Sequence, residues 1–144
     1  MKTSYIPKGF HTVTPYLIVS DAERLVQFLR DVFDVQEVIL MKNPAGKIQH
    51  AAFRIGDSMV ELANGHGEWA PMTAALHVYV PDTDATYARA IRAGGTSLHE
   101  PKDMFYGERS GGVKDAFGNH WYIATQTEEL SDEEIRQRAA KECA

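Results

Sequence analysis

The chain of 144 residues is poor in cysteine, in positive charge and in long apolar segments. Its single cysteine, Cys143, excludes an internal disulfide and a cysteine-based metal cluster, and its place next to the C-terminus argues against a buried nucleophile. Fifteen Lys and Arg against twenty Asp and Glu give a net charge of −5, so the field that nucleic-acid binding needs is missing. Without an apolar run of about 18 residues or an apolar leader, we expect a soluble, cytoplasmic protein with no membrane partner.

The acidic residues gather at the end of the chain. Residues 128–144 hold six acidic and three basic side chains, which leaves the rest of the chain close to neutral. Ser131 and Glu134 have the spacing of a capping box, in which both side chains satisfy backbone groups at the start of a helix. We therefore predict an acidic, solvated C-terminal helix within 128–144.

The rest of the chain contains one pattern twice. VTPYLIVSD (13–21) and AALHVYVPD (74–82) are short apolar runs that end at Asp21 and Asp82, and an amphipathic helical pattern follows each aspartate. The two aspartates are 61 positions apart, and the same offset aligns VELA (60–63) with WYIA (121–124). Two more extended stretches lie between helix and final strand in each half. Chance similarity of short patterns is the alternative, but the shared offset favours a repeated β-α-β-β-β unit.

Such a unit cannot cover both faces of its own sheet, so two copies should combine. We predict an α+β fold in which two tandem β-α-β-β-β units, about 11–66 and 72–127, form a curved mixed sheet around a cleft with the helices outside. The domain would span 1–127, and the helix of 128–144 would follow it.

Several of these stretches carry a family resemblance. YLIVSDA, HVYVPDTDA, the strand-ending Glu61, YGERSGGVKDAFGNHW and the IAT ending resemble the glyoxalase/bleomycin-resistance/dioxygenase (vicinal oxygen chelate) superfamily over about 11–126. They are most similar to its branch often labelled 3-demethylubiquinone methyltransferase-like. The resemblance implies the paired-unit fold, a small-molecule ligand and a homodimer.

The metal enzymes of this superfamily place His, Glu or Gln on the first and last strands of each half. Here the corresponding positions, counted back from the two aspartates and along the last strands, are Thr14, Glu61, Ala75 and Tyr122. Only Glu61 is an ordinary ligand, whereas a catalytic divalent metal needs about three protein ligands. A rearranged site through histidines remains an alternative, but we predict no metal and no other cofactor.

Strand alternation predicts which side chains face the cleft. Tyr16, His50, Arg54, Glu61, His77, Tyr79, His120 and Tyr122 should face it, and Tyr106 should lie on a loop at its mouth. These are the predicted ligand-binding residues, because aromatic rings with few polar groups suit a planar small molecule. Glu61, His50 and His77 are the candidate catalytic residues, since an acid in an apolar cleft can exchange protons beside a histidine. The alternative for Glu61 is an inert pair with Arg54 or a histidine.

The signature YGERSGGVKDAFGN suggests a structural role for two of its charges. We expect Arg109 and Asp115 to form a charge-assisted pair that ties the loop to the strand.

The function that fits best is a non-metal binding protein that sequesters an aromatic or amphipathic compound, as resistance proteins of the superfamily do. The alternative is an enzyme, either a metal-dependent lyase, isomerase or dioxygenase or a metal-free acid–base catalyst that uses Glu61 and a cleft histidine. A third interpretation is an interaction module whose cleft is filled by its own side chains.

Overall fold

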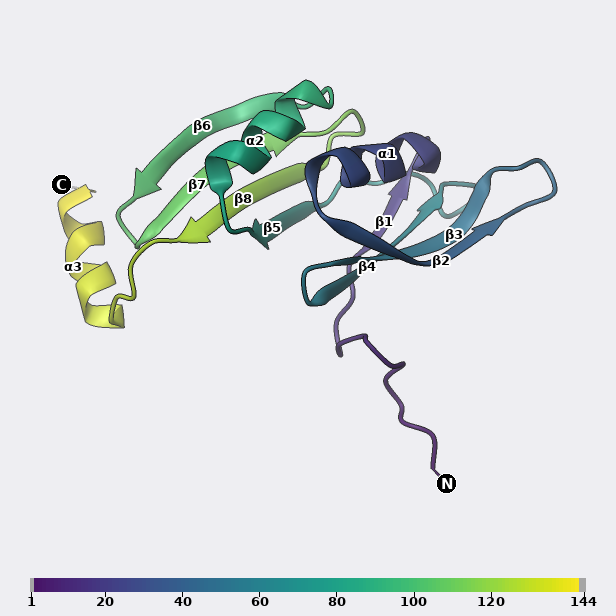
Figure 1. Cartoon of the computed structure of the whole chain (residues 1–144), viewed down its shortest axis with the longest axis horizontal. Helices are drawn as coiled ribbons and strands as arrows, with labels where there is room; N and C mark the ends of the chain where they lie inside the picture. Colours follow the sequence, from purple (N-terminus) through teal and green to yellow (C-terminus); the bar gives the residue numbers. More distant parts are fainter. Residues whose placement is uncertain (1, 143–144) are drawn as a thin grey trace. The chain divides into compact units, whose positions relative to one another are not determined.

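The structure, a computed structural model, describes residues 2–142 (Figure 1). The interpretation of Cys143 lies outside the described residues. The chain forms two compact units, one that ends at Ala74 and one that begins at Ala75, and each is described by itself.

The first unit follows the predicted order of one strand, one helix and three strands. Its elements are β1 (Tyr16–Val19), α1 (Ala22–Val32), β2 (Val35–Lys42), β3 (Ile48–Ile55) and β4 (Ser58–Asn64). The strands form a sheet of order β1-β4-β3-β2, in which β1 and β4 run parallel and the other pairs antiparallel. Helix α1 lies along one face of this sheet and contacts β1 and β4 (Figure 1).

The second unit repeats this topology. Its elements are β5 (Ala75–Tyr79), α2 (Thr83–Arg92), β6 (Thr96–Met104), β7 (Glu108–Lys114) and β8 (His120–Gln126), followed by α3 (Asp132–Glu142). The sheet order is β5-β8-β7-β6, again with one parallel pair between the first and last strands. The prediction of two tandem β-α-β-β-β units is thus confirmed, and each unit forms its own four-stranded mixed sheet.

The offset of 61 positions holds at the level of single residues. Tyr16 pairs with Glu61 across β1 and β4, and His77 pairs with Tyr122 across β5 and β8. The two helices also begin in the same way, because the side chains of Asp21 and Asp82 accept hydrogen bonds from backbone N–H groups three residues later. The repeat is therefore structural.

The buried side chains follow the predicted alternation. Residues of β1, β4 and β8 with almost no exposed surface include Leu17, Val19, Val60, Leu62, Trp121 and Ile123. They pack together with the apolar stripe of α1 in the first unit and with α2 in the second. Strand alternation assigns Ala52, Met59 and Ala124 to the face opposite the helix, but they too are buried. They provide no accessible lining.

The loop between β7 and β8 is organised by a buried carboxylate. Asp115 accepts hydrogen bonds from the backbone N–H groups of Phe117 and Asn119, from the Asn119 side chain and from Trp121 Nε1, at 2.8–3.0 Å. The predicted pair of Arg109 with Asp115 is wrong. Arg109 instead binds Asp84 in the first turn of α2, with Nε 2.6 Å from Oδ2, and this contact lowers the pKa of Asp84.

Helix α3 is solvated, as predicted. None of its residues is buried, and the backbone N–H of Glu134 donates to Ser131 Oγ at 3.1 Å, which confirms the cap. Arg138 holds the helix to the second unit through Glu128 (2.6 Å) and the carbonyl oxygen of Phe105 (3.2 Å). Within residues 2–142, no helix is both long enough and apolar enough to cross a membrane.

We predict that Asp115→Ala lowers the free energy of unfolding by about 3 kcal/mol, because several buried donors lose a charged acceptor at once. Urea denaturation followed by tryptophan fluorescence would measure this loss. Asp103→Ala is the control, since Asp103 is exposed and its contact with Arg109 is long, at 3.3 Å. Equal stability of the two variants would contradict the structural role of Asp115.

Candidate ligand-binding site

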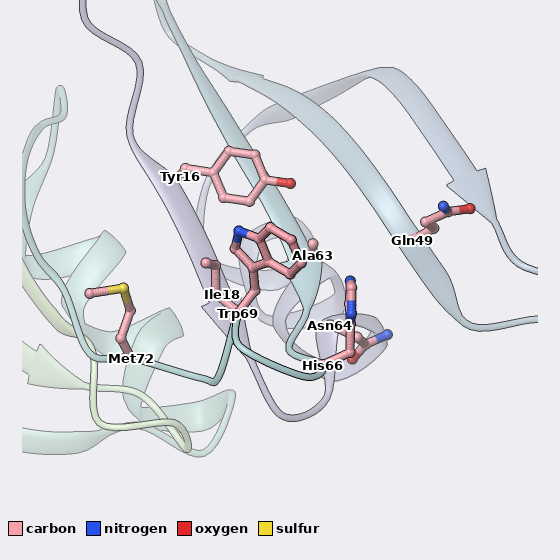
Figure 2. A pocket seen from close by; sticks show the side chains of 8 residues that line it. All are labelled: Tyr16, Ile18, Gln49, Ala63, Asn64, His66, Trp69 and Met72. Atoms are coloured by element: carbon pink, nitrogen blue, oxygen red, sulfur yellow. The ribbon is translucent and has the colours of Figure 1, made fainter.

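A pocket of about 610 Å³ opens on the first unit, on strands β1, β3 and β4 and on the loop that follows β4 (Figure 2). Its lining consists of Tyr16, Ile18, Gln49, Ala63, Asn64, His66, Trp69 and Met72. Tyr16 and Ile18 are alternate residues of β1, so they project from the same face of the sheet. That face is opposite to the one on which Leu17 and Val19 are buried.

The loop after β4 carries the most exposed large apolar side chains of the lining. His66 and Trp69 exchange two backbone hydrogen bonds of 2.9 Å, and their rings lie 5.6 Å apart. The backbone N–H of Met72 donates to the carbonyl oxygen of Ile18 at 3.1 Å, which fastens the loop to β1. Trp69 is 56% exposed and Met72 64% exposed, although the loop backbone is held in place. A large aromatic ring is thus presented to solvent on an ordered loop.

The polar side chain of Asn64 in the pocket wall is already engaged in internal hydrogen bonds. Asn64 accepts from the backbone N–H of Ala22 at 2.7 Å and donates to the carbonyl oxygen of Ile48 at 3.0 Å. Burial alone would raise the pKa of the neighbouring Glu23, but hydrogen bonds from Ile48 N–H and the Asn64 amide lower it. These contacts connect β3, β4 and the start of α1, so Asn64 supports the wall of the pocket.

Three of the predicted residues meet beside this pocket. Tyr16 forms part of the lining, and its hydroxyl lies 3.2 Å from His50 Nδ1. His50 Nε2 lies 3.4 Å from Glu61 Oε1, with both side chains about a quarter exposed (28% and 27%). Burial, and secondly the charge of Glu61, raise the pKa of Tyr16. Of the two partners expected for Glu61, the structure therefore shows the histidine.

Arg54 lies elsewhere on the same unit. Its Nε is buried without a hydrogen-bond partner, and a Cβ placed on Gly9 would be 2.7 Å from its Nη2, so the N-terminal segment passes over it. Arg54 does not belong to the lining of the pocket described above. Its part in ligand binding stays a prediction.

Three predicted residues of the second unit, His77, Tyr79 and Tyr106, lie near Glu108, a carboxylate that was not predicted from the sequence. Tyr79 donates to Glu108 Oε1 at 2.6 Å, and His77 Nε2 lies 3.6 Å from Glu108 Oε2. The hydrogen bond to Glu108 is the main reason why the pKa of Tyr79 is raised, and burial with the charge of Glu108 raises that of Tyr106. Whether this cluster binds a ligand stays a prediction.

His120 and Tyr122 form a third contact in the second unit. His120 Nδ1 lies 3.1 Å from the Tyr122 hydroxyl, and the two rings meet edge to face. This contact occupies the position where a metal enzyme of the resembled superfamily would have a carboxylate.

The donor atoms within each unit do not fit a catalytic divalent metal. Glu61 pairs with Tyr16 in the register of β1 and β4. Thr14, the expected metal-ligand position of the first strand, lies before β1 begins. His50 with Glu61, and His77 with Glu108, provide two ordinary ligands each. No group of three or more His, Cys, Asp or Glu side chains placed to hold a metal ion occurs within residues 2–142. A catalytic metal site needs about three protein ligands, so neither pair is sufficient to hold such a metal alone.

The sequence analysis missed most of the pocket wall, namely Gln49, Asn64, His66, Trp69 and Met72. The stretch NGHGEWAPMT (64–73) did contain a signal for exposed apolar side chains, because Gly and Pro indicate a surface loop and the same segment carries a Trp and a Met.

The fold and its repeated register agree with comparisons to known proteins. The sequence pattern of the Glyoxalase/Bleomycin resistance protein/Dioxygenase superfamily matches residues 9–123, so the chain belongs to this superfamily. The narrower methyltransferase-like branch stays a prediction.

Individual relatives support the same conclusion. An uncharacterized protein of Mycobacterium bovis is 33% identical over 135 residues, which cover 86% of this chain and 89% of the relative. Among solved structures, TioX from Micromonospora sp. ML1 has a TM-score of 0.70 at 22% identity and covers 81% of this chain and 98% of its own. The fosfomycin resistance protein FosX from Mesorhizobium loti has a TM-score of 0.58 at 23% identity, over 85% and 95%. The likeness to these two structures concerns the fold alone.

We predict that Tyr16 ionises at higher pH than an ordinary tyrosine and that Glu61→Gln brings its pKa partly back. The pKa remains raised in the variant because burial, the larger cause, is unchanged. The phenolate absorbance of Tyr16, obtained as the difference between each protein and its Tyr16→Phe counterpart over an alkaline titration, would measure both values. A Tyr16 signal that rises at the same pH with and without the Glu61 charge would contradict the geometry.

Proposed function

We propose that this protein binds a small aromatic or amphipathic compound in the pocket of the first unit and sequesters it without converting it. The observation that carries the proposal is the pocket of about 610 Å³ with Tyr16 and Trp69 in its wall. Its volume lies within the range of typical small-molecule sites, about 300–1,000 Å³. Aromatic and thioether side chains there offer flat, polarizable surface to a planar ligand.

The exposure of the lining supports binding over a purely structural role. A large indole that is more than half exposed gains little from its position in the free protein, whereas covering it with a ligand removes apolar surface from water. None of the residues that line the pocket is an Asp, Glu, Lys or Arg, which suits an uncharged ring system. A cleft filled by the protein's own side chains, the third interpretation of the sequence, would leave no such volume.

Two further parts of the proposal rest on the superfamily. The protein would be a homodimer, and it would act in the cytoplasm. The structurally similar FosX is a fosfomycin resistance protein, which is consistent with sequestration or removal of a toxic compound as the general role.

We predict that Trp69→Leu weakens the binding of a neutral bicyclic aromatic compound by about tenfold, or ~1.4 kcal/mol. Because the protein's other tryptophan, Trp121, is fully buried, ligand-dependent quenching of indole fluorescence reports on Trp69. Calorimetric titration would give the affinity of both proteins.

The matched control is Tyr5→Leu, which removes an exposed aromatic ring, 91% accessible, that does not belong to the lining of the pocket. Its affinity should equal that of the wild type. Equal weakening by both substitutions, or none by Trp69→Leu, would contradict binding in this pocket.

A second candidate function is a metal-free acid–base enzyme, and the 3.4 Å approach of His50 to Glu61 favours it. A histidine beside a carboxylate at the edge of a pocket can transfer protons to a bound molecule. Sequestration and catalysis differ in the fate of the bound compound.

We predict that a compound bound by the protein is recovered unchanged after long incubation, both without metal and with added Zn²⁺ or Mn²⁺. Mass spectrometry of the released compound would detect any product. Conversion that is lost in Glu61→Ala would overturn sequestration in favour of the enzyme.

A further inference from the structure

The hydroxyl of Tyr16 is the outer member of a chain of three polar side chains that leads away from the pocket. Tyr16 comes from β1, His50 from β3 and Glu61 from β4, and their polar atoms are separated by 3.2 Å and 3.4 Å. The register of the sheet positions all three, because Tyr16 pairs with Glu61 across the parallel strands. A ligand in the pocket therefore meets a phenol whose hydrogen bonding depends on two residues behind it.

The tautomer of His50, and with it the direction of the Tyr16–His50 hydrogen bond, follows from the charge that His50 Nε2 faces. An ionised carboxylate can only accept, so the nitrogen of His50 that faces Glu61 is the one that carries the hydrogen. The other nitrogen of the neutral ring, Nδ1, then has a lone pair and accepts from the Tyr16 hydroxyl. Because the Tyr16 hydroxyl donates its hydrogen bond to His50, only the lone pairs of its oxygen remain for a ligand.

The surroundings keep this arrangement in place. The raised pKa of Tyr16 keeps the phenol protonated in neutral and mildly alkaline solution, so its hydrogen stays available for His50. The two amide side chains of the lining, Asn64 and Gln49, do not favour either a donor or an acceptor on the ligand. Asn64 is engaged in internal hydrogen bonds, and the Gln49 amide can present either its oxygen or its nitrogen.

We propose that Tyr16 selects aromatic ligands that carry a hydrogen-bond donor, such as phenols and aromatic amines, and discriminates against related molecules that carry only an acceptor. The proposal rests on the function proposed above, since it specifies which ligands the pocket of the first unit takes. Glu61 and His50 act as positioning residues, because they set the polarity of the Tyr16 hydroxyl.

The test uses 2-naphthol and 2-methoxynaphthalene, which share a ring system and differ in whether the substituent can donate. Calorimetric titration at pH 8, where an ordinary histidine is neutral, would give both dissociation constants. The wild type should bind 2-naphthol about tenfold more tightly. Hydrophobicity alone would favour the methyl ether, so the expected preference runs against the general trend.

Two variants separate this inference from a merely structural role. Tyr16→Phe keeps the ring, so 2-methoxynaphthalene should still bind, while the preference for 2-naphthol should disappear. Glu61→Gln introduces an amide that can donate to His50 Nε2, which allows the hydrogen of the ring to move to Nδ1 and frees the Tyr16 hydroxyl to donate into the pocket. The preference for 2-naphthol over 2-methoxynaphthalene should then fall to that of Tyr16→Phe or below.

The control is Glu108→Gln, which makes the same change in the cluster of carboxylate, tyrosine and histidine in the second unit. It should leave the ratio of affinities unchanged. Equal binding of both naphthalenes by the wild type, or a ratio that Tyr16→Phe does not alter, would overturn the inference while the proposed function stands. Failure of the wild type to bind either naphthalene would overturn the inference and also count against the proposed function.

Discussion

In each unit the first strand pairs in parallel with the last, and the register of this pairing decides which side chains of the two strands face the helix and which face away from it. Because side chains alternate along a strand, the register that sets Tyr16 beside Glu61 also sends Leu17 and Leu62 to the helix side. A slip of one residue would exchange the two faces and expose the core. The same register recurs in the second unit, where His77 lies beside Tyr122. The buried face thus fixes the positions of the polar groups on the other face.

The two units use this accessible face differently. In the first, the loop after β4 places Trp69 over the sheet and leaves a pocket, and a tyrosine, a histidine and a carboxylate meet at its edge. In the second, the equivalent position to Tyr16 is His77, and the carboxylate that joins it is Glu108 on β7. Both units therefore gather the same three chemical groups from different strand positions. This similarity of chemistry does not follow from the sequence offset, which aligns Glu61 with Tyr122.

The sequence could predict features that depend on local patterns. Strand and helix periodicity, with Asp21 and Asp82 as caps, gave the order of elements and the repeat, and alternation grouped Tyr16, His50 and Glu61 on one face. It could not predict the path of the loop that carries Trp69, because that path depends on a hydrogen bond to β1, distant in sequence. The partner of Arg109 was missed for a similar reason, since Asp84 on α2 approaches it only after the helix packs on the sheet. Nor does a charge pattern reveal that Asp115 is buried beneath Trp121 Nε1.

The proposed function depends most on whether the pocket of the first unit receives an aromatic ligand. A crystal structure of the protein with the tightest-binding compound from a panel of bicyclic aromatics would test it most directly. We expect electron density for the ring system against Tyr16 and Trp69, with the substituent near the Tyr16 hydroxyl. Density for the compound at another place on the molecule, with the pocket of the first unit empty at saturating concentration, would contradict it.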